Sequence, residues 1–218
     1  MKKYDVKKLV SASKSPEALL DQVIIPNILK DPNALYSSEK LPIIDLSLRE
    51  ILGLVLVSFV FQNMSGKKLL PASNPDGRDG YLVWLEERDS VGIPFEQVFV
   101  TKFESEGLES AIVQAVKNKS AKGVQYAKDY GLIVFSSKKG EVQTPRLRKN
   151  ISFTPFESVW WISRTDKKDL KYFVSLLKSN GGDPLGDYIV LIEPEKKTVT
   201  VNHLIYSKKA PKRNEESI

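Results

Sequence analysis

Three carboxylates near a predicted hairpin are the residues of this sequence best suited to chemistry. Asp76 and Asp79 lie in a glycine-containing stretch, residues 75–81, at a turn that leads into a strand, and Glu96 lies on the next strand. Neighbouring strands can bring such carboxylates close enough to share a metal ion, which would activate water and stabilise charge on phosphate. Each also has a structural explanation: aspartate beside glycine commonly forms turns, and Glu96 would face solvent in an edge strand.

The rest of the composition restricts the chemistry further. The 218 residues include no cysteine and one histidine, which excludes thiolate zinc sites, iron–sulfur clusters and cysteine nucleophiles. The single histidine, His203, alternates with Val201 and Ile205 on a predicted strand, where a packed histidine is the simpler interpretation. Carboxylates remain as metal ligands, and they favour a hard cation such as Mg²⁺ or Mn²⁺. The sequence also lacks phosphate-loop, dinucleotide-binding, zincin and α/β-hydrolase motifs.

The elements that must position these acids can be predicted from local patterns. A capping box from Ser47 to Glu50 begins a helix that runs to about Met64 with apolar residues on every side, which is typical of a buried helix. The patterns then predict a short strand, the two hairpin strands, a helix and an apolar strand, over Lys67–Leu70, Tyr81–Glu87, Phe95–Phe103, Ser105 to about Lys128, and residues 131–135. A strand, a crossover helix and a buried strand predict a parallel pair.

Further elements are predicted on both sides of this region. Ser15 and Pro16 begin a helix that continues to Leu29. The C-terminal part is predicted as strand, helix, strand and strand, over Ser158–Arg164, Asp166–Ser179, Tyr188–Ile192 and Thr198–Tyr206. Trp160 and Trp161 point to opposite faces of the first of these strands, so one of them is expected in the core. We therefore predict an α/β fold with a mixed sheet flanked by helices, in a single domain over residues 1–206, followed by a disordered polar tail, residues 207–218.

Lys119 is the amine that the pattern places closest to the acids. On the predicted helix it falls within about 20° of the apolar stripe formed by Leu108, Ile112 and Ala115, so its side chain is expected to point inward. Tyr126 lies on the same stripe. The alternative is that Lys119 extends its ammonium group to solvent while its stem covers apolar surface.

With an Asp-bearing strand, a Glu-bearing strand, a helix and a strand following a buried helix, residues 45–136 resemble the restriction-endonuclease-like (PD-(D/E)XK) nuclease superfamily. In that family an Asp at the start of the second strand and an Asp/Glu-x-Lys triplet on the third converge on magnesium. Asp79 and Glu96 match these two acids. Some relatives add an acid from the opening helix, which would be Glu50, although its place in the capping box explains it fully.

The sequence departs from the family pattern at one position. Val98 stands where the triplet has lysine, and Lys102 is roughly 20 Å from Glu96 along the strand, too far to replace it. In some members of the superfamily the lysine has moved to the following helix. The resemblance therefore implies that Lys119 would orient the attacking water and offset developing phosphate charge, as the third catalytic residue beside Asp79 and Glu96.

Charge suits a nucleic-acid partner without proving one. The net charge is +6 and the pI about 9.2. Five basic residues after the apolar strand are predicted to contact phosphates, the alternative being a solvated loop: Lys138, Lys139, Arg146, Arg148 and Lys149. DNA is expected in preference to RNA, and a homodimer is one assembly compatible with cutting both strands. The longest apolar stretch, Ile51–Phe61, is too short to span a bilayer, and no secretory signal is visible, so we expect a cytoplasmic protein without membrane contact.

These expectations lead to one main hypothesis and two alternatives. The resemblance implies a divalent-metal-dependent nuclease that hydrolyses phosphodiester bonds in DNA, in restriction or defence. The first alternative is a nuclease-like fold that has lost catalysis, for which Val98 would be the trace, and that binds nucleic acid or a partner. The second is an unrelated α/β interaction protein with a positive surface.

Overall fold

The structure is a computed structural model of the chain. It describes residues 10–42, 44–73, 79–85, 90–101, 107–136, 142–165, 170–182 and 185–205. The predicted polar tail, residues 207–218, lies outside these ranges.

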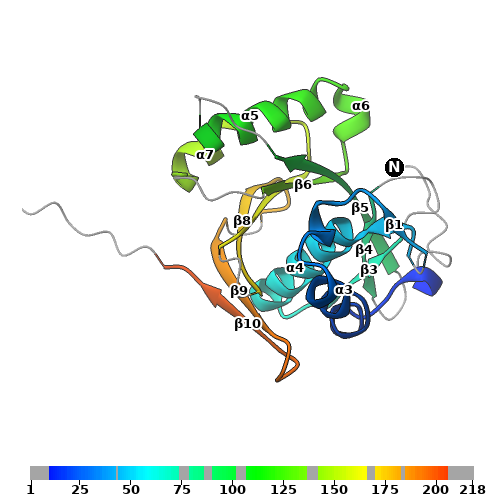
Figure 1. Cartoon of the computed structure of the whole chain (residues 1–218). Helices are drawn as coiled ribbons and strands as arrows, with labels where there is room; N and C mark the ends of the chain where they lie inside the picture. Colours follow the sequence, from blue (N-terminus) through cyan, green and yellow to red (C-terminus); the bar gives the residue numbers. More distant parts are fainter. Residues whose placement is uncertain are drawn as a thin grey trace, which may run out of the picture.

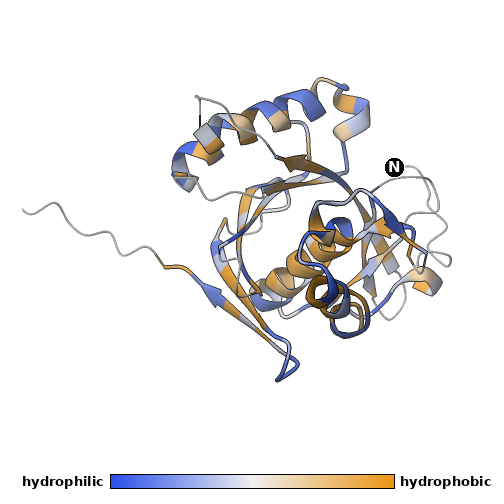
Figure 2. Ribbon diagram, in the orientation of Figure 1, coloured by the Kyte–Doolittle hydropathy of each residue, from blue (hydrophilic) through white to orange (hydrophobic). Residues whose placement is uncertain are grey.

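A long apolar helix, α4 (Leu48–Ser65), lies at the centre of the fold (Figure 1). The predicted capping box is present: Ser47 N–H donates to Glu50 Oε2 at 2.7 Å, and Glu50 N–H donates to Ser47 Oγ at 3.4 Å. The helix ends at Gly66, whose φ of 71° is left-handed and costs glycine little. The buried residues of α4 include every position from Ile51 to Ser58 and so cover all of its sides, as expected of a helix that other elements surround. Figure 2 shows the mostly hydrophobic side of α4 that faces the viewer.

Length and composition alone would allow α4 to cross a membrane, but most of it is buried inside the structure. This burial fits the core helix of a soluble fold, and α4 is therefore weak evidence for a membrane span.

One mixed sheet of eight strands, counted over the described residues, curls around α4 in the order β10-β9-β8-β7-β6-β5-β4-β3 (Figure 1). The first part follows α4 as an antiparallel meander of β3 (Leu69–Ala72), β4 (Tyr81–Leu85) and β5 (Ser90–Val100). The helices α5 (Gly107–Ser120) and α6 (Val124–Ala127) then lead to β6 (Gly131–Ser136), which is parallel to β5. The predicted antiparallel hairpin and parallel pair are thus confirmed. Strand β5 begins at Ser90 and not at Phe95 as predicted, however, so its pairing with β4 falls entirely on residues that precede the predicted strand.

The second part of the chain extends the sheet beyond β6. Helix α7 (Thr144–Asn150) precedes β7 (Ser158–Arg164), which is parallel to β6. The antiparallel strands β8 (Leu170–Ser179), β9 (Asp187–Glu193) and β10 (Thr198–His203) follow. The prediction of a helix over Asp166–Ser179 is wrong, because residues 170–179 form β8 and hydrogen-bond to strands on both sides; residues 166–169 lie outside the described part of the chain.

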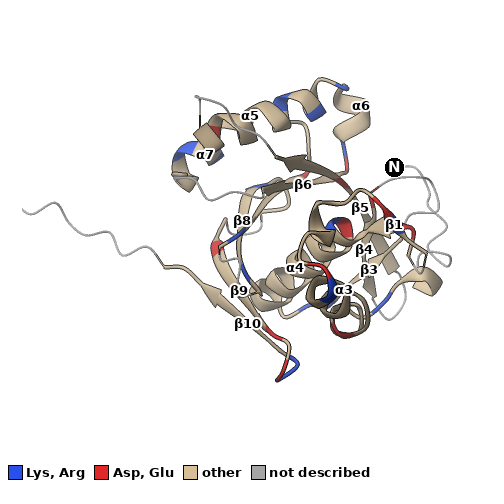
Figure 3. Cartoon of the chain, viewed as in Figure 1, with Lys and Arg blue, Asp and Glu red and all other residues tan. Residues whose placement is uncertain are grey.

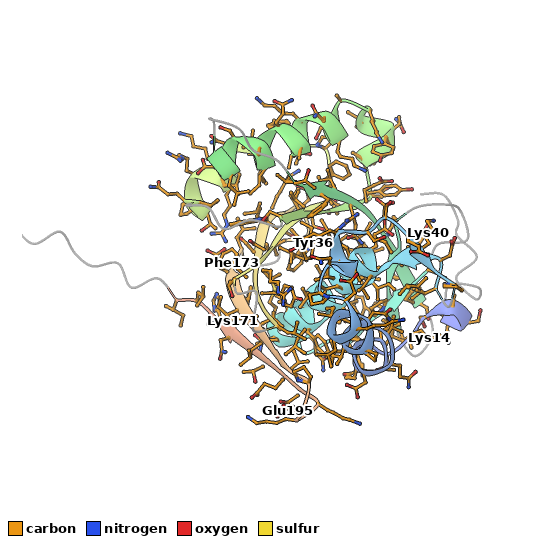
Figure 4. The ribbon with its side chains drawn as sticks, viewed as in Figure 1. Lys14, Tyr36, Lys40, Lys171, Phe173 and Glu195 are labelled. Carbon is orange, nitrogen blue, oxygen red and sulfur yellow. The ribbon has the colours of Figure 1, made fainter. Side chains whose placement is uncertain are left out.

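Each face of the sheet carries its own hydrophobic core. The inner face packs against α4 and the N-terminal helices, whereas the outer face packs against α5, α6 and α7. Trp160 belongs to the inner core and Trp161 to the outer one. Both tryptophans are therefore buried, whereas only one was expected in the core. Side chains fill the space between the central helix and the sheet (Figure 4).

The N-terminal segment covers one side of α4. It forms a continuous helical stretch of α2 (Pro16–Leu19), the π-helical turn η1 (Leu20–Ile24) and α3 (Ile25–Lys30), which confirms the helix predicted after Ser15. A short 3₁₀ helix, η2 (Ala34–Tyr36), and a two-stranded ladder of β1 (Lys40–Leu41) with β2 (Leu46–Ser47) connect it to α4.

Candidate active site

Asp79, Glu96 and Lys119 meet at one point, although they come from three separate elements. Lys119 Nζ lies 3.0 Å from Glu96 Oε2 and 4.0 Å from Asp79 Oδ2. Their side chains are 18, 9 and 29% exposed for Lys119, Glu96 and Asp79. The cluster is therefore largely shielded from solvent, yet one acid remains accessible. The third acid of the sequence stretch, Asp76, lies outside the described residues.

Strand pairing places the two acids. Asp79 and Gly80 directly precede β4, and the Gly80 carbonyl accepts a hydrogen bond from Phe95 N–H at 2.9 Å. Two residues along β5, Gln97 N–H donates to Asp79 Oδ2 at 2.7 Å. The pairing of β4 with β5 ends at Tyr81 opposite Pro94. The Asp79 carboxylate therefore binds the backbone N–H of Gln97, which lies beyond the last paired residue of β5. Asp79 is thereby fixed beside β5.

Alternation along β5 sends its side chains to different faces of the sheet. Glu96 faces outward, where it meets Lys119 of α5, and Val98 packs into the same outer core. Gln97 faces inward, where its Nε2 donates to the backbone carbonyl of Glu50 at 2.9 Å and to that of Asp79 at 3.4 Å. The inner and outer sides of the sheet thus both contribute to holding the site.

Gln97 is a site residue whose role the sequence pattern did not reveal. It is 7% exposed and joins the N-terminal part of α4 to the segment that carries Asp79. Gly53 makes room for it, because a Cβ at that position would lie 2.8 Å from Gln97 Oε1. A glycine one helical turn after Glu50 was the available signal, and it could be interpreted only once β5 was known to cross α4 there.

The side chain of Lys119 lies as its spacing on the helix predicted. Leu108, Ile112 and Val116 form the buried side of α5, and Lys119 continues that side toward the sheet at the end of the helix. The lysine therefore reaches Glu96 from the helix that follows β5.

The first turn of α4 adds two further charged groups. The negative charge of Glu50 raises the pKa of Asp79. The Glu50 carboxylate also caps the helix, because it accepts a hydrogen bond from Ser47 N–H. Arg49 was not identified from the sequence. Burial lowers the pKa of its guanidinium, and the negative charges of Glu50 and Asp79 act in the opposite direction. Arg49 also lies over the ring of Phe99 at 4.5 Å from the ring centre. A second cation thus stands near the acids on the inner side.

The surroundings change the acidity of Asp79. Burial raises the pKa of its carboxyl, and the neighbouring Glu96 raises it further, whereas the hydrogen bond from Gln97 N–H and the charge of Lys119 act in the opposite direction. The net direction is upward. Such a carboxyl gains from a nearby cation, because the carboxylate form is otherwise disfavoured by its burial.

The predicted phosphate-binding residues do not gather at this site. Lys138 and Lys139 lie outside the described residues. Arg146 forms a two-pronged ion pair with Glu109, at 2.7 and 2.8 Å, near the start of α5. Glu109 precedes Lys119 by ten residues, which is roughly 15 Å along a helix.

Arg148 and Lys149 differ in their surroundings. Arg148 Nη2 donates to Asp187 Oδ1 at 2.6 Å, and this carboxylate, 1% exposed, also accepts from Ser175 Oγ and Thr144 Oγ1. Lys149 is exposed. The ion pairs of Arg146 and Arg148 give both a structural role, so Lys149 is the predicted residue of α7 best placed to meet a phosphate. Figure 3 shows the basic residues of α7 and those near the end of α5 at opposite ends of the outer helical layer.

Two carboxylates, rather than three, form the acidic part of the site. Over the described ranges no group of three or more His, Cys, Asp or Glu side chains is arranged to hold a metal ion. Asp79 and Glu96 nevertheless each place one carboxylate oxygen within 4.0 Å of Lys119 Nζ. Magnesium commonly binds one or two carboxylates and completes its shell with water and phosphate oxygens. The two carboxylates therefore fit a Mg²⁺ ion that takes the rest of its ligands from outside the protein.

The function of the chain has to be inferred from this chemistry. Searches of protein-family models, curated proteins and solved structures find no match to the chain.

Proposed function

We propose that this protein is a divalent-metal-dependent nuclease that hydrolyses phosphodiester bonds in DNA, as a divergent member of the PD-(D/E)XK superfamily. The observation that carries the proposal is the meeting of Asp79, Glu96 and Lys119, which come from a strand start, a neighbouring strand and the following helix. Asp79 and Glu96 are 17 positions apart in the chain, and Glu96 and Lys119 are 23 positions apart. Their side chains converge although the burial of apolar surface does not require it. A purely structural ion pair would not require a second, partly exposed carboxylate with a raised pKa.

The order of elements supports the same proposal. Helix α4, the antiparallel strands β3, β4 and β5, the crossover helix α5 and the parallel strand β6 follow one another as the resemblance implies. The strands β7 to β10 would then be additions to the nuclease-like core, and the N-terminal helices would cover its inner face.

Asp79 and Glu96 would hold the metal, Mg²⁺ or Mn²⁺. When bound, the ion would lower the pKa of a coordinated water and stabilise negative charge on the phosphate. Gln97 N–H keeps the Asp79 carboxylate in place through its 2.7 Å hydrogen bond, and Gln97 Nε2 ties the same segment to α4. Glu50 is a weaker candidate for a third ligand, because Ser47 N–H already binds one of its oxygens.

Lys119 would act on the phosphate rather than on the metal. In its ion pair with Glu96 it is an ammonium group, which donates hydrogen bonds and carries positive charge. These properties suit it to orient the attacking water and to offset the negative charge of the transition state. It would take the place of the family lysine at position 98, where Val98 packs into the outer core.

The decisive test is cleavage of plasmid and linear DNA by the purified protein with Mg²⁺ or Mn²⁺. The expected result is cleavage that Asp79→Asn and Glu96→Gln abolish, while the matched variant Glu195→Gln, at an exposed acid in the turn between β9 and β10, cuts like the wild type. If the wild type binds DNA in a salt-dependent way but never cuts it, the alternative of a nuclease-like binding protein without catalysis holds instead. If it neither binds nor cuts, the nuclease proposal fails.

A further inference from the structure

A groove of about 420 Å³ opens directly beside the candidate site. It lies between the second half of β5 and the helix α5, on the outer side of the sheet. Lys119 lines the groove as well as the site, so the two are continuous. The other lining residues come from the same two elements and the residues that directly follow them: Val98, Phe99, Val100, Thr101, Ala111, Gln114, Ala115, Asn118 and Lys122.

The groove exists because β5 extends past its neighbour. Strand β4 pairs with β5 only over Ser90–Pro94, so in the described part of the chain the β4-side edge of β5 has no strand partner beyond Pro94. Val98 and Phe99, whose side chains point to opposite faces of the sheet, both line the groove and show that it follows this edge. Opposite them α5 presents the small side chains of Ala111 and Ala115, which leave the space open.

The lining has an apolar floor, amide groups and positive charge. Val98, Val100, Ala111 and Ala115 contribute to its apolar part. On the exposed side Gln114 Nε2 donates to Asn118 Oδ1 at 2.8 Å, which leaves further amide donors and acceptors for a ligand. Lys119, whose ammonium group also faces Glu96, and Lys122, whose Nζ lies 4.8 Å from the centre of the Tyr126 ring, supply two cations. No acidic residue is among the described residues that line the groove.

We propose that this groove takes the nucleoside adjacent to the reacting phosphate, from an unpaired stretch of the nucleic acid strand. This inference rests on the proposed nuclease function and adds a preference for a substrate that is single-stranded at that position. The flat faces of a base suit a narrow apolar floor, its edge can bind amides, and the flanking phosphates suit the two lysines. A volume near the lower end of the range for small-ligand sites, about 300–1,000 Å³, fits one nucleoside and not a base pair.

A mononucleotide tests the groove without any need for catalysis. Thymidine 5′-monophosphate is titrated into the ¹⁵N-labelled protein, and the amide shifts are recorded. The expected shifts fall on residues 98–101 and 111–122. Ala115→Leu, which fills the groove, should weaken binding about tenfold or more, whereas Ala121→Leu, at an exposed position beyond the helix, should not change it. Shifts elsewhere, or equal binding by Ala115→Leu, would overturn the inference.

A second variant avoids any effect of Ala115→Leu on folding. Asn118 is exposed, so Asn118→Ala should leave the fold intact and weaken mononucleotide binding by about two- to tenfold through the loss of an amide contact. Unchanged binding by Asn118→Ala would likewise overturn the inference.

Cleavage of matched substrates separates this inference from the proposed function. The wild type is expected to cut single-stranded DNA, or duplex DNA with a frayed end, faster than a closed duplex, and Ala115→Leu should reduce this preference. Cleavage by the wild type without any preference would overturn the groove proposal and leave the nuclease proposal standing. If the mononucleotide binds in the groove but DNA is never cut, catalysis fails and the groove remains a nucleotide site.

Discussion

Replacing Lys119 by methionine should have opposite effects on metal binding and on cleavage. Methionine keeps the length of the side chain but removes the ammonium group that faces two carboxylates. At 3.0 Å from Glu96 the Coulomb attraction is about 5.5 kcal/mol for an effective dielectric constant of about 20, and the 4.0 Å contact with Asp79 adds about 4 kcal/mol. The desolvation of the charges offsets much of this attraction, so we expect Lys119→Met to lower the free energy of unfolding by about 3 kcal/mol.

Two conditions should restore the lost stability. The charge of Lys119 lowers the pKa of Asp79, so in the variant that pKa should rise further, and the stability should recover as the pH falls and the Asp79 carboxyl becomes neutral. Mg²⁺ at neutral pH should do the same, because it supplies positive charge to both acids. An ion at 100 times its dissociation constant adds about 2.7 kcal/mol, so the variant should recover most of its loss.

Thermal unfolding with and without Mg²⁺, at several pH values, measures these effects. For a chain of this size a loss of about 3 kcal/mol lowers the Tm by roughly 6–12 °C. Calorimetric titration should show that the variant binds Mg²⁺ more tightly than the wild type, while its cleavage rate falls about 100-fold or more. Lys117→Met, at an exposed position of the same helix, is the matched control and should change none of these values. Equal stability and equal Mg²⁺ affinity in Lys119→Met and the wild type would refute this account of the site.

Three further outcomes follow from other parts of the structure. Burial and Glu96 raise the pKa of Asp79, and Mg²⁺ binds the carboxylate form, so on acidification the calorimetric Mg²⁺ affinity should start to fall at a higher pH than it would for an exposed aspartate. Asp79→Asn should remove this dependence, and a curve that falls only at the pH of an ordinary aspartate would contradict the expectation. Asp187→Ala leaves the half-buried Arg148 without its carboxylate and should cost about 3–5 kcal/mol in urea unfolding, and a loss below about 1 kcal/mol would show that the network is not needed. Gly80→Ala meets both a φ of 125° and a Cβ only 2.5 Å from Leu54 Cδ1, so it should lower the Tm and, by displacing the adjacent acid, slow cleavage; an unchanged Tm would be inconsistent with that packing.

Local patterns were sufficient to predict the part of the fold that carries the site. The capping box at Ser47 and the apolar strand from Gly131 are present in the structure as their local patterns predicted, whereas most of the turn predicted before Tyr81 lies outside the described residues. Helical spacing was also enough to send Lys119 toward the sheet, because the stripe of α5 that packs against the outer core is well defined. The contact between Lys119 and the acids then follows from the parallel crossover.

The wrong prediction of a helix over residues 170–179 arose where long-range pairing decided the structure. Residues 170–179 have apolar residues at spacings that suit a helix as well as a strand, and hydrogen bonds to β7 and β9 select the strand. Tyr172 and Val174 then face the inner core, while Phe173 packs on the outer one. The ion pairs of Arg146 and Arg148 were invisible for a similar reason, since their partners Glu109 and Asp187 lie 37 and 39 residues away.

The enclosure of α4 makes the two ends of the sheet depend on each other. This helix contacts β3 and β4 at one end of the sheet and β8, β9 and β10 at the other, and its surface is apolar all round. A truncation that deletes the last three strands would remove no residue near Asp79, yet it would expose one apolar side of α4 to water. We expect such a shortened chain to aggregate, and unfolding of the intact protein to proceed as a single cooperative transition in which the acids and the distant C-terminal hairpin are lost together.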